Sequence, residues 1–380
     1  MKKYNAAIAA ISLLLAAAVT AVVVVLCRRA GRGTPDFIFP EPSPALLSTS
    51  ETIGAHGTAI TDKYAESTES ALGETEETPL IITSNNPQFR SKITLEGFDI
   101  IIEGVCEDKY VQSACLASDG VKADAEYDGK NYRIILKNRH SENEYDTVYV
   151  FNSDHSITDY RVQVTSDGFA PIDTAEVAEN NLRLAENPVT LPREGVLRYI
   201  IPDGDPVGAR EVINQAEEIS DKICEGITDD YDKAFAISQW ISDNIYYDFD
   251  ASSDSVTTET ISLSHVLETH RTVCGGYSNL FSALCAVQGI KVCNIRGEAL
   301  NEVLTYAETD KGELHEWNYA VINGRGVWVD VGWNSYNTYK DGQYKYNGTQ
   351  MKYFDLTNTV MSYDHRARTC EVRDYYAVLE

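Results

Sequence analysis

The chain has 380 residues, a formal net charge of -26 at pH 7 and a pI near 4.6. Phosphate backbones and anionic lipid surfaces would repel so acidic a chain, so nucleic acid is excluded as a partner and a neutral or cationic substrate is favoured. The length allows two domains with connecting segments, and the 43% of hydrophobic residues can form a sizeable core. The acidity also has a simpler explanation, which is solubility outside the cell.

Residues 1–27 are predicted to be an N-terminal membrane anchor. Between Ala6 and Cys27 the chain carries no charge over 22 residues, which is enough for one helix across a bilayer. The apolar run continues past its small residues into 22–26, and this favours an uncleaved anchor over a cleaved signal peptide. Basic residues flank both ends, so the positive-inside rule leaves the orientation open. We expect a single-pass protein of the cell membrane with its catalytic part extracytoplasmic, because the next segment suits a tether.

Residues 28–88 are predicted to form a disordered acidic linker. From Gly33 to Gln88 the chain is rich in Pro, Ser, Thr, Ala and Glu, and it has nine carboxylates against the single Lys63. No hydrophobic period is sustained in this stretch, so it lacks the means to bury a core.

Residues 89–168 predict a small antiparallel β-sandwich, immunoglobulin-like in size. Short strand patterns recur in ITLEGFDIIIEG, NYRIILK, DTVYVFN and DYRVQV, with a turn signal at Asp128-Gly129. No catalytic set of side chains lies in this region, so its expected role is that of a spacer or docking module. Cys106 and Cys115 could form a disulfide or remain two core thiols, and the sequence leaves both readings open.

A connector is predicted at 169–204, with strand character near Val196–Ile201, and a catalytic domain at 205–380. The domain opens with two amphipathic helices, Ala209–Glu225 and Asp229–Ile245, the second capped by Thr228. Tyr247 follows the second helix. The family resemblance given below implies that its hydroxyl is a candidate for the oxyanion hole, together with the backbone amide of Cys274.

The stretch from Arg271 to Ile290 predicts a helix with Cys274 at its first turn. Apolar residues recur from Tyr277 at the spacing of a buried helical face, and Gly289 ends the helix. Free backbone N–H groups and the helix dipole favour a thiolate at this position, and the two glycines that follow would let a substrate backbone approach. The alternative is that Cys274 is a small buried hydrophobic residue, as most free cysteines are.

The segment from His315 to Asn334 predicts a hairpin of two strands around Asn323-Gly324. A two-residue turn would set position 315 opposite 332 and 317 opposite 330, so Asp330 would share a face with His315. Such diagonal neighbours lie about 7–8 Å apart at the backbone, within reach of a side-chain hydrogen bond. A three-residue loop would place Asp330 on the far face, so the inference depends on an even loop length.

Other candidate residues receive a structural interpretation. His265 and His270 could serve as the base by proximity in sequence, but His270 would need a tight backfold to reach Cys274. The cysteines at 224, 285 and 293 lie in predicted helix or strand interiors and are expected to be inert. The tyrosine-rich segment 335–350 could be a lid or a stacking platform, or simply a surface hairpin. No cofactor or metal is expected, because the eight cysteines contain no CxxC pair.

The sequences of these segments resemble those of the transglutaminase-like superfamily of papain-like cysteine enzymes, in its bacterial membrane-anchored cell-surface type. The resemblance is carried by TVCGGYS, HEWNYAVI and WVDVGWN, and it extends through WISDNIYYD, SLSHVLETHRT and YFDLTNTVMSYDHRA. Thr272 is a departure, since many members have glycine two residues before the cysteine. The resemblance implies that Cys274 is the nucleophile, His315 the general base and acid, and Asp330 the carboxylate that orients His315.

The expected fold class is therefore α+β, a papain-like transglutaminase core preceded by the β-sandwich and a transmembrane helix. The expected activity is hydrolysis or acyl transfer at amide bonds through a thioester on Cys274, with a cell-surface protein or cell-wall peptide as the substrate. Two alternatives remain, a non-catalytic cell-surface binding module that retains the fold and a cell-wall endopeptidase of the other Cys-His family. The endopeptidase alternative fits poorly with the predicted hairpin and with an aspartate, Asp330, as the third residue of the catalytic triad.

Overall fold

A computed structural model describes residues 78–251, 256–299 and 312–376. The predicted membrane anchor at 1–27 and the predicted linker up to residue 77 lie outside this range. No helix within the described residues combines the length and the apolar character needed to cross a bilayer.

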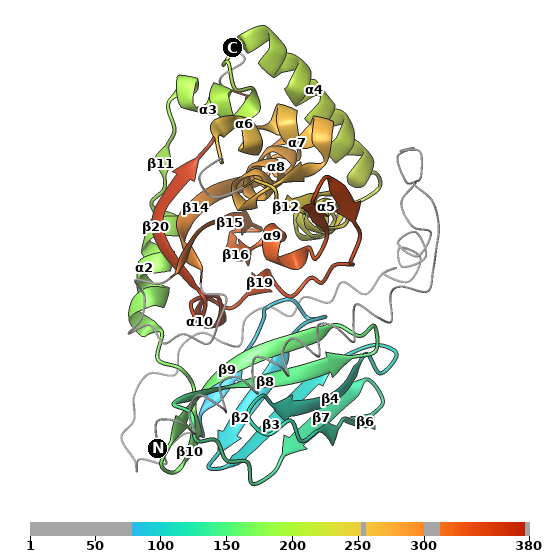
Figure 1. Cartoon of the computed structure of the whole chain (residues 1–380), viewed down its shortest axis with the longest axis vertical. Helices are drawn as coiled ribbons and strands as arrows, with labels where there is room; N and C mark the ends of the chain where they lie inside the picture. The colour runs from blue at the N-terminus through green and yellow to red at the C-terminus, as the bar shows by residue number, and fades with distance from the viewer. Residues whose placement is uncertain (1–77, 252–255, 300–311, 377–380) are drawn as a thin grey trace. The chain divides into compact units, whose positions relative to one another are not determined.

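The first folded region consists of two five-stranded antiparallel sheets (Figure 1). One sheet has the order β1 (Leu80–Ile82), β2 (Ser91–Glu96), β3 (Asp99–Val105), β7 (Asn131–Leu136) and β6 (Glu126–Asp128). The other has the order β10 (Gly168–Ala170), β9 (Ile157–Thr165), β8 (Tyr145–Asn152), β4 (Val111–Leu116) and β5 (Ala123–Asp124). The four strand patterns recognised in the sequence correspond to β2 with β3, β7, β8 and β9.

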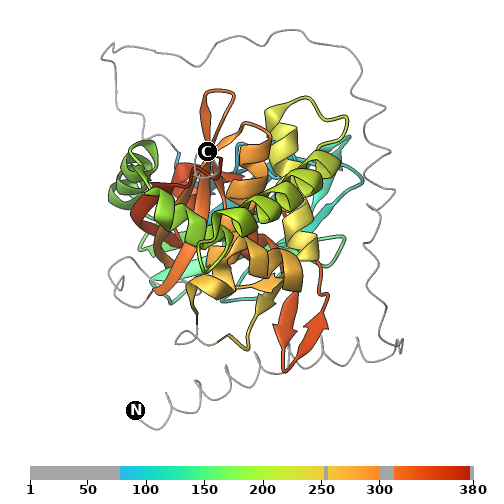
Figure 2. The same cartoon turned by 90° about the horizontal axis from the view of Figure 1, so that it is seen from above.

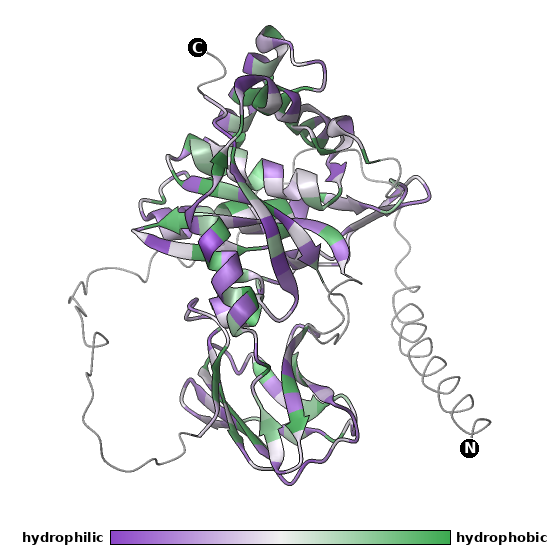
Figure 3. Cartoon of the chain, turned by 90° about the vertical axis from the view of Figure 1, so that its left-hand side faces the viewer, coloured by the Kyte–Doolittle hydropathy of each residue, from purple (hydrophilic) through white to green (hydrophobic). Residues whose placement is uncertain are grey.

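The buried side chains of these two sheets pack in one hydrophobic cluster. Along β7, Tyr132, Ile134 and Leu136 are buried and the residues between them are exposed. Figure 3 shows hydrophobic and hydrophilic residues interspersed along the strands of this region. Strand β1 corrects the sequence prediction, which had assigned its residues to the disordered linker. Its Ile81 is buried, so three consecutive apolar residues are enough to join the sheet edge where a window of average composition predicts disorder.

The second region is built on a six-stranded sheet. Its order is β11 (Val189–Thr190), β20 (His365–Val372), β14 (Lys291–Ala299), β15 (Glu313–Ile322), β16 (Arg325–Val329) and β19 (Phe354–Leu356). All neighbours are antiparallel except β11 and β20. A smaller sheet has the order β13 (Arg271–Thr272), β12 (Tyr246–Asp248), β17 (Thr338–Lys340) and β18 (Gln343–Lys345), and its β17–β18 hairpin projects from the helices (Figure 2).

Helices pack around the larger sheet and make the fold a mixed α/β one. In chain order they are α2 (Ala175–Glu186), α3 (Arg193–Ile200), α4 (Pro206–Ile223), α5 (Asp230–Asn244), α6 (Thr258–Ile261), α7 (Leu263–Thr269), α8 (Cys274–Val287), α9 (Val331–Asn334) and α10 (Asn358–Met361). Helix α2 packs on β20, and α4 and α5 pack on α8.

The predicted connector at 169–204 is folded, and its predicted strand is wrong. Residues 196–200 belong to helix α3, where Val196, Leu197 and Ile200 are buried on one side. Their spacing of one, three and four residues fits a helical face, so the local excess of β-branched and aromatic residues was misleading.

Helices α4 and α5 begin close to their predicted starts, and both are capped by aspartate. The Asp205 side chain accepts from the backbone N–H groups of Val207 and Gly208, and the Asp229 side chain accepts from those of Tyr231 and Asp232. The cap of α5 is therefore Asp229, one residue after the predicted Thr228. Either residue type suits an N-cap, so the sequence alone does not decide between neighbouring candidates.

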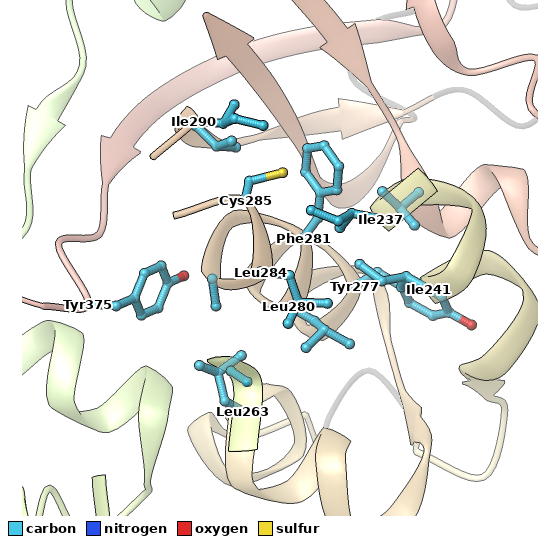
Figure 4. Packing of buried hydrophobic residues seen from close by; sticks show 14 of the residues in the cluster. Ile237, Ile241, Leu263, Tyr277, Leu280, Phe281, Leu284, Cys285, Ile290 and Tyr375 are labelled. Atoms are coloured by element: carbon cyan, nitrogen blue, oxygen red, sulfur yellow. The ribbon is translucent and has the colours of Figure 1, made fainter. Parts of the chain in front are cut away.

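Helix α8 passes through the centre of a hydrophobic core in the second region. Figure 4 shows Leu280, Phe281 and Leu284 among side chains from other elements, including Ile241 and Leu263. Every residue from 275 to 285 is buried, so the helix is enclosed on all sides, not only along the predicted stripe. Its polar side chains are satisfied by distant backbone groups: Asn279, for example, donates to the Tyr199 and Ile261 carbonyls at 2.8 and 3.0 Å.

Candidate active site

Cys274 is the first residue of helix α8 and is partly exposed. Its neighbour Thr272 is fully buried in β13 and donates to the Thr260 carbonyl at 2.8 Å. A Cβ on Gly276 would overlap the Thr272 side chain, so glycine is needed there for packing against β13. Gly275 is likewise buried, with Ile261 beside it. The expectation that these two glycines admit a substrate backbone is therefore wrong.

The predicted hairpin forms around a two-residue turn. Asn323 and Gly324 have φ values of 53° and 75°, as a type I′ turn requires, and Ile322 pairs with Arg325. The register is the one inferred from the sequence, and it persists to the pair Asn318 and Val329. Strand β16 ends there, and Asp330 serves as the N-cap of α9, its Oδ1 accepting from the Trp333 backbone N–H at 3.0 Å.

His315 links the cysteine to the aspartate. Its Nε2 lies 2.6 Å from Asp330 Oδ2, and its ring is close enough to Cys274 for the cysteine side chain to affect its ionisation. Both His315 and Asp330 are buried. The structure thus brings together the three residues singled out in the sequence, Cys274, His315 and Asp330.

The ionisation of this pair follows from its geometry. Burial opposes a charged imidazole, but the Asp330 carboxylate and, to a smaller extent, the nearby Cys274 outweigh burial and raise the pKa of His315 well above its ordinary value. Burial would likewise raise the pKa of Asp330, but the neighbouring His315 and His365 side chains outweigh it and hold that pKa well below its usual range. The pair therefore favours an imidazolium beside a carboxylate.

Comparison with known proteins is consistent with this arrangement. Residues 217–333 match the model of the transglutaminase-like superfamily. Residues 217–333 therefore belong to the transglutaminase-like superfamily. The kyphoscoliosis peptidases of Mus musculus and Homo sapiens are each 30% identical over 120 residues, which make up 31% of this chain and 18% of each relative. The chain thus covers less than a fifth of the length of these relatives.

Two solved structures share a limited likeness with the chain. A candidate cysteine protease from Cytophaga hutchinsonii is 17% identical, with a TM-score of 0.28, 70% of this chain covered and 78% of that one. A TGase structure is 12% identical, with a TM-score of 0.27, 63% of this chain covered and 47% of that one. At these TM-scores the likeness carries no weight, and the family assignment depends on residues 217–333.

A further buried histidine lies at this site, outside the matched residues 217–333, and sequence reasoning did not place it there. His365 begins β20, and its Nε2 lies 2.9 Å from Asp330 Oδ2. Its Nδ1 lies 2.6 Å from Asp364 Oδ1. From the sequence, His365 lies in the family-like stretch after Phe354 and is expected to close the domain core, not to touch substrate. The adjacent Asp364 was the available signal, because a histidine beside a carboxylate is a common way to hold an imidazole.

His315, Asp330 and His365 are the three ligand-type side chains that come together among the described residues. The two imidazole nitrogens lie 2.6 and 2.9 Å from the same Asp330 oxygen, which are hydrogen-bond distances. Ligands around a tetrahedral zinc ion, each bonded at about 2.0–2.1 Å, would be about 3.3 Å apart. The geometry therefore fits a hydrogen-bonded chain and does not fit a metal centre.

The competing histidines occupy other positions in the transglutaminase-like domain. His265 lies within α7, where burial lowers its pKa. His270 ends α7 with a left-handed φ of 54°, and burial lowers its pKa as well. The imidazole that interacts with Cys274 is that of His315.

Tyr247 lies near Cys274, at the N-terminal end of helix α8. Burial, followed by the charge on Cys274, raises the pKa of the Tyr247 phenol. Its ring stacks on Tyr277 at 6.5 Å and contacts Phe249 at 5.1 Å. Phe249 is 57% exposed, so an apolar surface borders the site.

Cys106 and Cys115 are free thiols, so the disulfide that the sequence left open does not form in this structure. The segment 335–350, left open between a lid and a surface hairpin, contains the β17–β18 hairpin, and β17 pairs in parallel with β12. Arg271 stacks on Tyr339 of this hairpin, 4.0 Å from the ring centroid. These contacts extend the smaller sheet and give Tyr339 a packing role, whereas Tyr336, Tyr344 and Tyr346 are exposed.

Proposed function

We propose that the chain is a membrane-tethered, extracytoplasmic cysteine enzyme that cleaves or transfers acyl groups at amide bonds through a thioester on Cys274. The transglutaminase-like domain supplies the fold, and the predicted anchor at 1–27 supplies the tether. The cell-surface location implies a cell-surface protein or a cell-wall peptide as the substrate.

One observation carries the proposal, namely that the His315 side chain contacts Cys274 on one side and Asp330 on the other. A nucleophile, a base and a third group that orients the base are the parts that covalent acyl transfer requires. A cysteine at a helix N-terminus beside an imidazolium is also the environment in which a thiolate is stabilised. The buried pair thus supports a nucleophilic role for Cys274.

In the proposed reaction the Cys274 sulfur attacks the carbonyl carbon of an amide and forms a C–S bond. The C–N bond breaks, and His315 gives its proton to the leaving amine. Either water or an amine then attacks the thioester and loses a proton to His315, and the Cys274 thiolate leaves. Water yields a carboxylic acid, whereas an amine yields a new amide, so the acceptor decides between hydrolysis and transamidation.

Charge on the carbonyl oxygen needs hydrogen-bond donors during this attack. The backbone N–H of Cys274 lies in the first turn of α8, where helix N–H groups have no partner within the helix. The Tyr247 hydroxyl is the second candidate donor, since Tyr247 lies close enough to Cys274 for a charge on the cysteine to raise the pKa of the phenol. The neighbouring exposed Phe249 supports a substrate with an apolar group near the reacting carbonyl.

Both matched relatives are named peptidases, and this favours hydrolysis as the first activity to test. The purified full-length chain is incubated with a thiol-reactive acyl probe, and the modified residue is mapped by mass spectrometry. We expect the acyl group on Cys274 and its loss in a Cys274→Ala variant. A folded wild-type protein that is not acylated at Cys274 would contradict the proposal and favour the non-catalytic binding module.

A further inference from the structure

Asp330 is shared by two imidazole rings. Its Oδ2 accepts from His315 Nε2 at 2.6 Å and from His365 Nε2 at 2.9 Å, while Oδ1 accepts from the Trp333 backbone N–H. The carboxylate thus has three N–H donors around it in a fully buried position. His365 supplies one of these donors from β20, an element distant in sequence from the β15–β16 hairpin.

His365 is held between two carboxylates. Its Nε2 faces Asp330, and its Nδ1 lies 2.6 Å from Asp364 Oδ1. A neutral imidazole has one N–H donor and one lone pair, so its lone pair would face a carboxylate oxygen at hydrogen-bond distance. Both nitrogens must therefore carry hydrogen, and His365 is an imidazolium.

The groups around Asp364 keep it ionised as the counter-ion. The Tyr353 hydroxyl donates to Asp364 Oδ2 at 2.8 Å. Burial would raise the pKa of Asp364, but the charge and hydrogen bond of His365 lower it, with smaller contributions from Arg161 and Lys352. Burial likewise opposes the charge on His365, and the two carboxylates outweigh burial and raise its pKa.

Aromatic rings exclude water from this chain of groups. The Trp317 and Trp333 rings lie 4.8 and 4.6 Å from the His365 ring, and the His315 ring lies 5.6 Å away. An apolar side chain would suit such surroundings better than a charged one, because burying an ion pair has a desolvation cost of several kcal/mol per ion. The charged His365 is thus poorly explained as a filler of the core.

We infer that His365 is a positioning residue, which fixes the Asp330 carboxylate from behind and thereby holds the His315 ring toward Cys274. The inference rests on the proposed function of Cys274 and His315. It adds His365 and Asp364 as a fourth and a fifth residue to the set formed by Cys274, His315 and Asp330. His365 also brings a positive charge close to Asp330, so it offsets part of the negative charge that acts on His315.

The test follows the titration of the His315 ring by NMR in the full-length chain with labelled histidine. In His365→Gln the side-chain amide can still donate to Asp330 but carries no charge. We expect the pKa of His315 to rise by about one unit or more, the size typical of removing one charge within a few ångströms. His265→Gln in α7 is the matched control and should leave the His315 titration unchanged.

A second measurement follows the rate of Cys274 acylation as a function of pH. We expect His365→Leu to lower the rate by about 10- to 100-fold, as for other groups that orient a functional side chain. His365→Gln should recover most of that rate near neutral pH, with the alkaline limb of its pH profile displaced upward. Recovery by a side chain that keeps only the donor is an outcome that a purely structural role would not produce.

The outcomes separate this inference from the proposed function. If wild-type Cys274 is not acylated, the proposed function fails, and the NMR titration still decides the role of His365. Folded His365→Gln and His365→Leu proteins with a wild-type His315 titration would overturn the inference. Should both variants fail to fold, Asp364→Asn removes the counter-ion instead and should displace the His315 titration in the same direction, whereas an unchanged titration would overturn the inference.

Discussion

At the scale of single residues, Cys274 differs from the other cysteines that the structure describes. It is partly exposed and lies beside the His315 imidazole, whereas the other six are buried. Burial raises the pKa of Cys224 to about 11 and that of Cys285 well above its usual value. A hydrogen bond with Cys370 lowers the pKa of Cys293, but both thiols are buried between β14 and β20.

Iodoacetamide at neutral pH should therefore alkylate Cys274 well before any other described cysteine. The thiolate is the reactive form, and access to the reagent is the second requirement. Peptide mapping at short reaction times measures the relative rates. Alkylation of Cys224 or Cys293 at a rate comparable to that of Cys274 would contradict this prediction.

The role of Asp330 can be isolated by Asp330→Asn. An asparagine keeps the size of the side chain, but it removes the charge and allows the wrong tautomer of His315. By analogy with Ser-His-Asp triads we expect a loss of turnover on the order of 10⁴. The rate of Cys274 acylation measures the effect, and circular dichroism checks the fold. His265→Ala and His270→Ala should cost much less, and an equal loss in either would transfer the role of the base.

The buried network should also make stability depend on pH. The lowered pKa of Asp330 contributes stability that is present above its unfolded pKa of about 3.9 and is lost as the pH falls through the folded value. The raised pKa of His365 contributes stability that is fully present below about pH 6.5 and is lost as the pH rises through the folded value.

Wild type should consequently lose more unfolding free energy than His365→Gln between pH 6 and pH 10. Urea denaturation at several pH values measures the difference, in which groups that the substitution does not affect cancel. The raised pKa expected for His315 in His365→Gln acts in the same direction, because the variant then keeps the stability contributed by His315 to a higher pH. Parallel curves for the two proteins would show that His365 is not charged in the folded state.

At the scale of elements, the β15–β16 turn sets which residue meets His315. Gly324 has a φ of 75°, and a Cβ there would have open space around it, so Gly324→Ala adds only backbone strain. We expect a loss of about 1–2 kcal/mol in unfolding free energy, with Cys274 acylation retained by the folded fraction. Asn323→Gly is the control, because glycine accepts the left-handed conformation. A larger loss would mean that the turn has contacts beyond the hairpin.

The hairpin and the core of α8 could be predicted because their signals are local. An Asn-Gly turn fixes the pairing of Ile322 with Arg325, and this register persists to Asn318 and Val329. Asp330 follows directly as the N-cap of α9, and from there its side chain reaches His315. The place of His365 is not local. It depends on β20 pairing with β14, where His365 faces Ala299, and no spacing within either segment specifies that partner. The strand predicted where helix α3 lies was wrong for a related reason. A short apolar run fits a strand or a buried helix equally well, and tertiary packing decided between them.

At the scale of the whole molecule, the six-stranded sheet separates two hydrophobic cores. Successive buried residues of β15 alternate between them: Trp317 and Tyr319 belong to one, and Ala320 and Ile322 to the other. Helix α8 lies in the core that contains Ala320 and Ile322. The aromatic rings near His365 belong to the core that contains Trp317 and Tyr319, or pack against it. The proposed site therefore joins side chains anchored in separate cores, which makes its geometry dependent on the packing of both faces.

The membrane tether is the last feature to test, and the folded region limits where a protease can act. The acidic linker predicted from residue 28 must end before strand β1 begins at Leu80. A protease added outside intact cells should cut between Gly33 and β1, because an unpacked polar segment is cleaved more readily than paired strands. We expect release of a soluble fragment that retains Cys274 acylation. Release of this fragment only after lysis would place the catalytic part on the other side of the membrane.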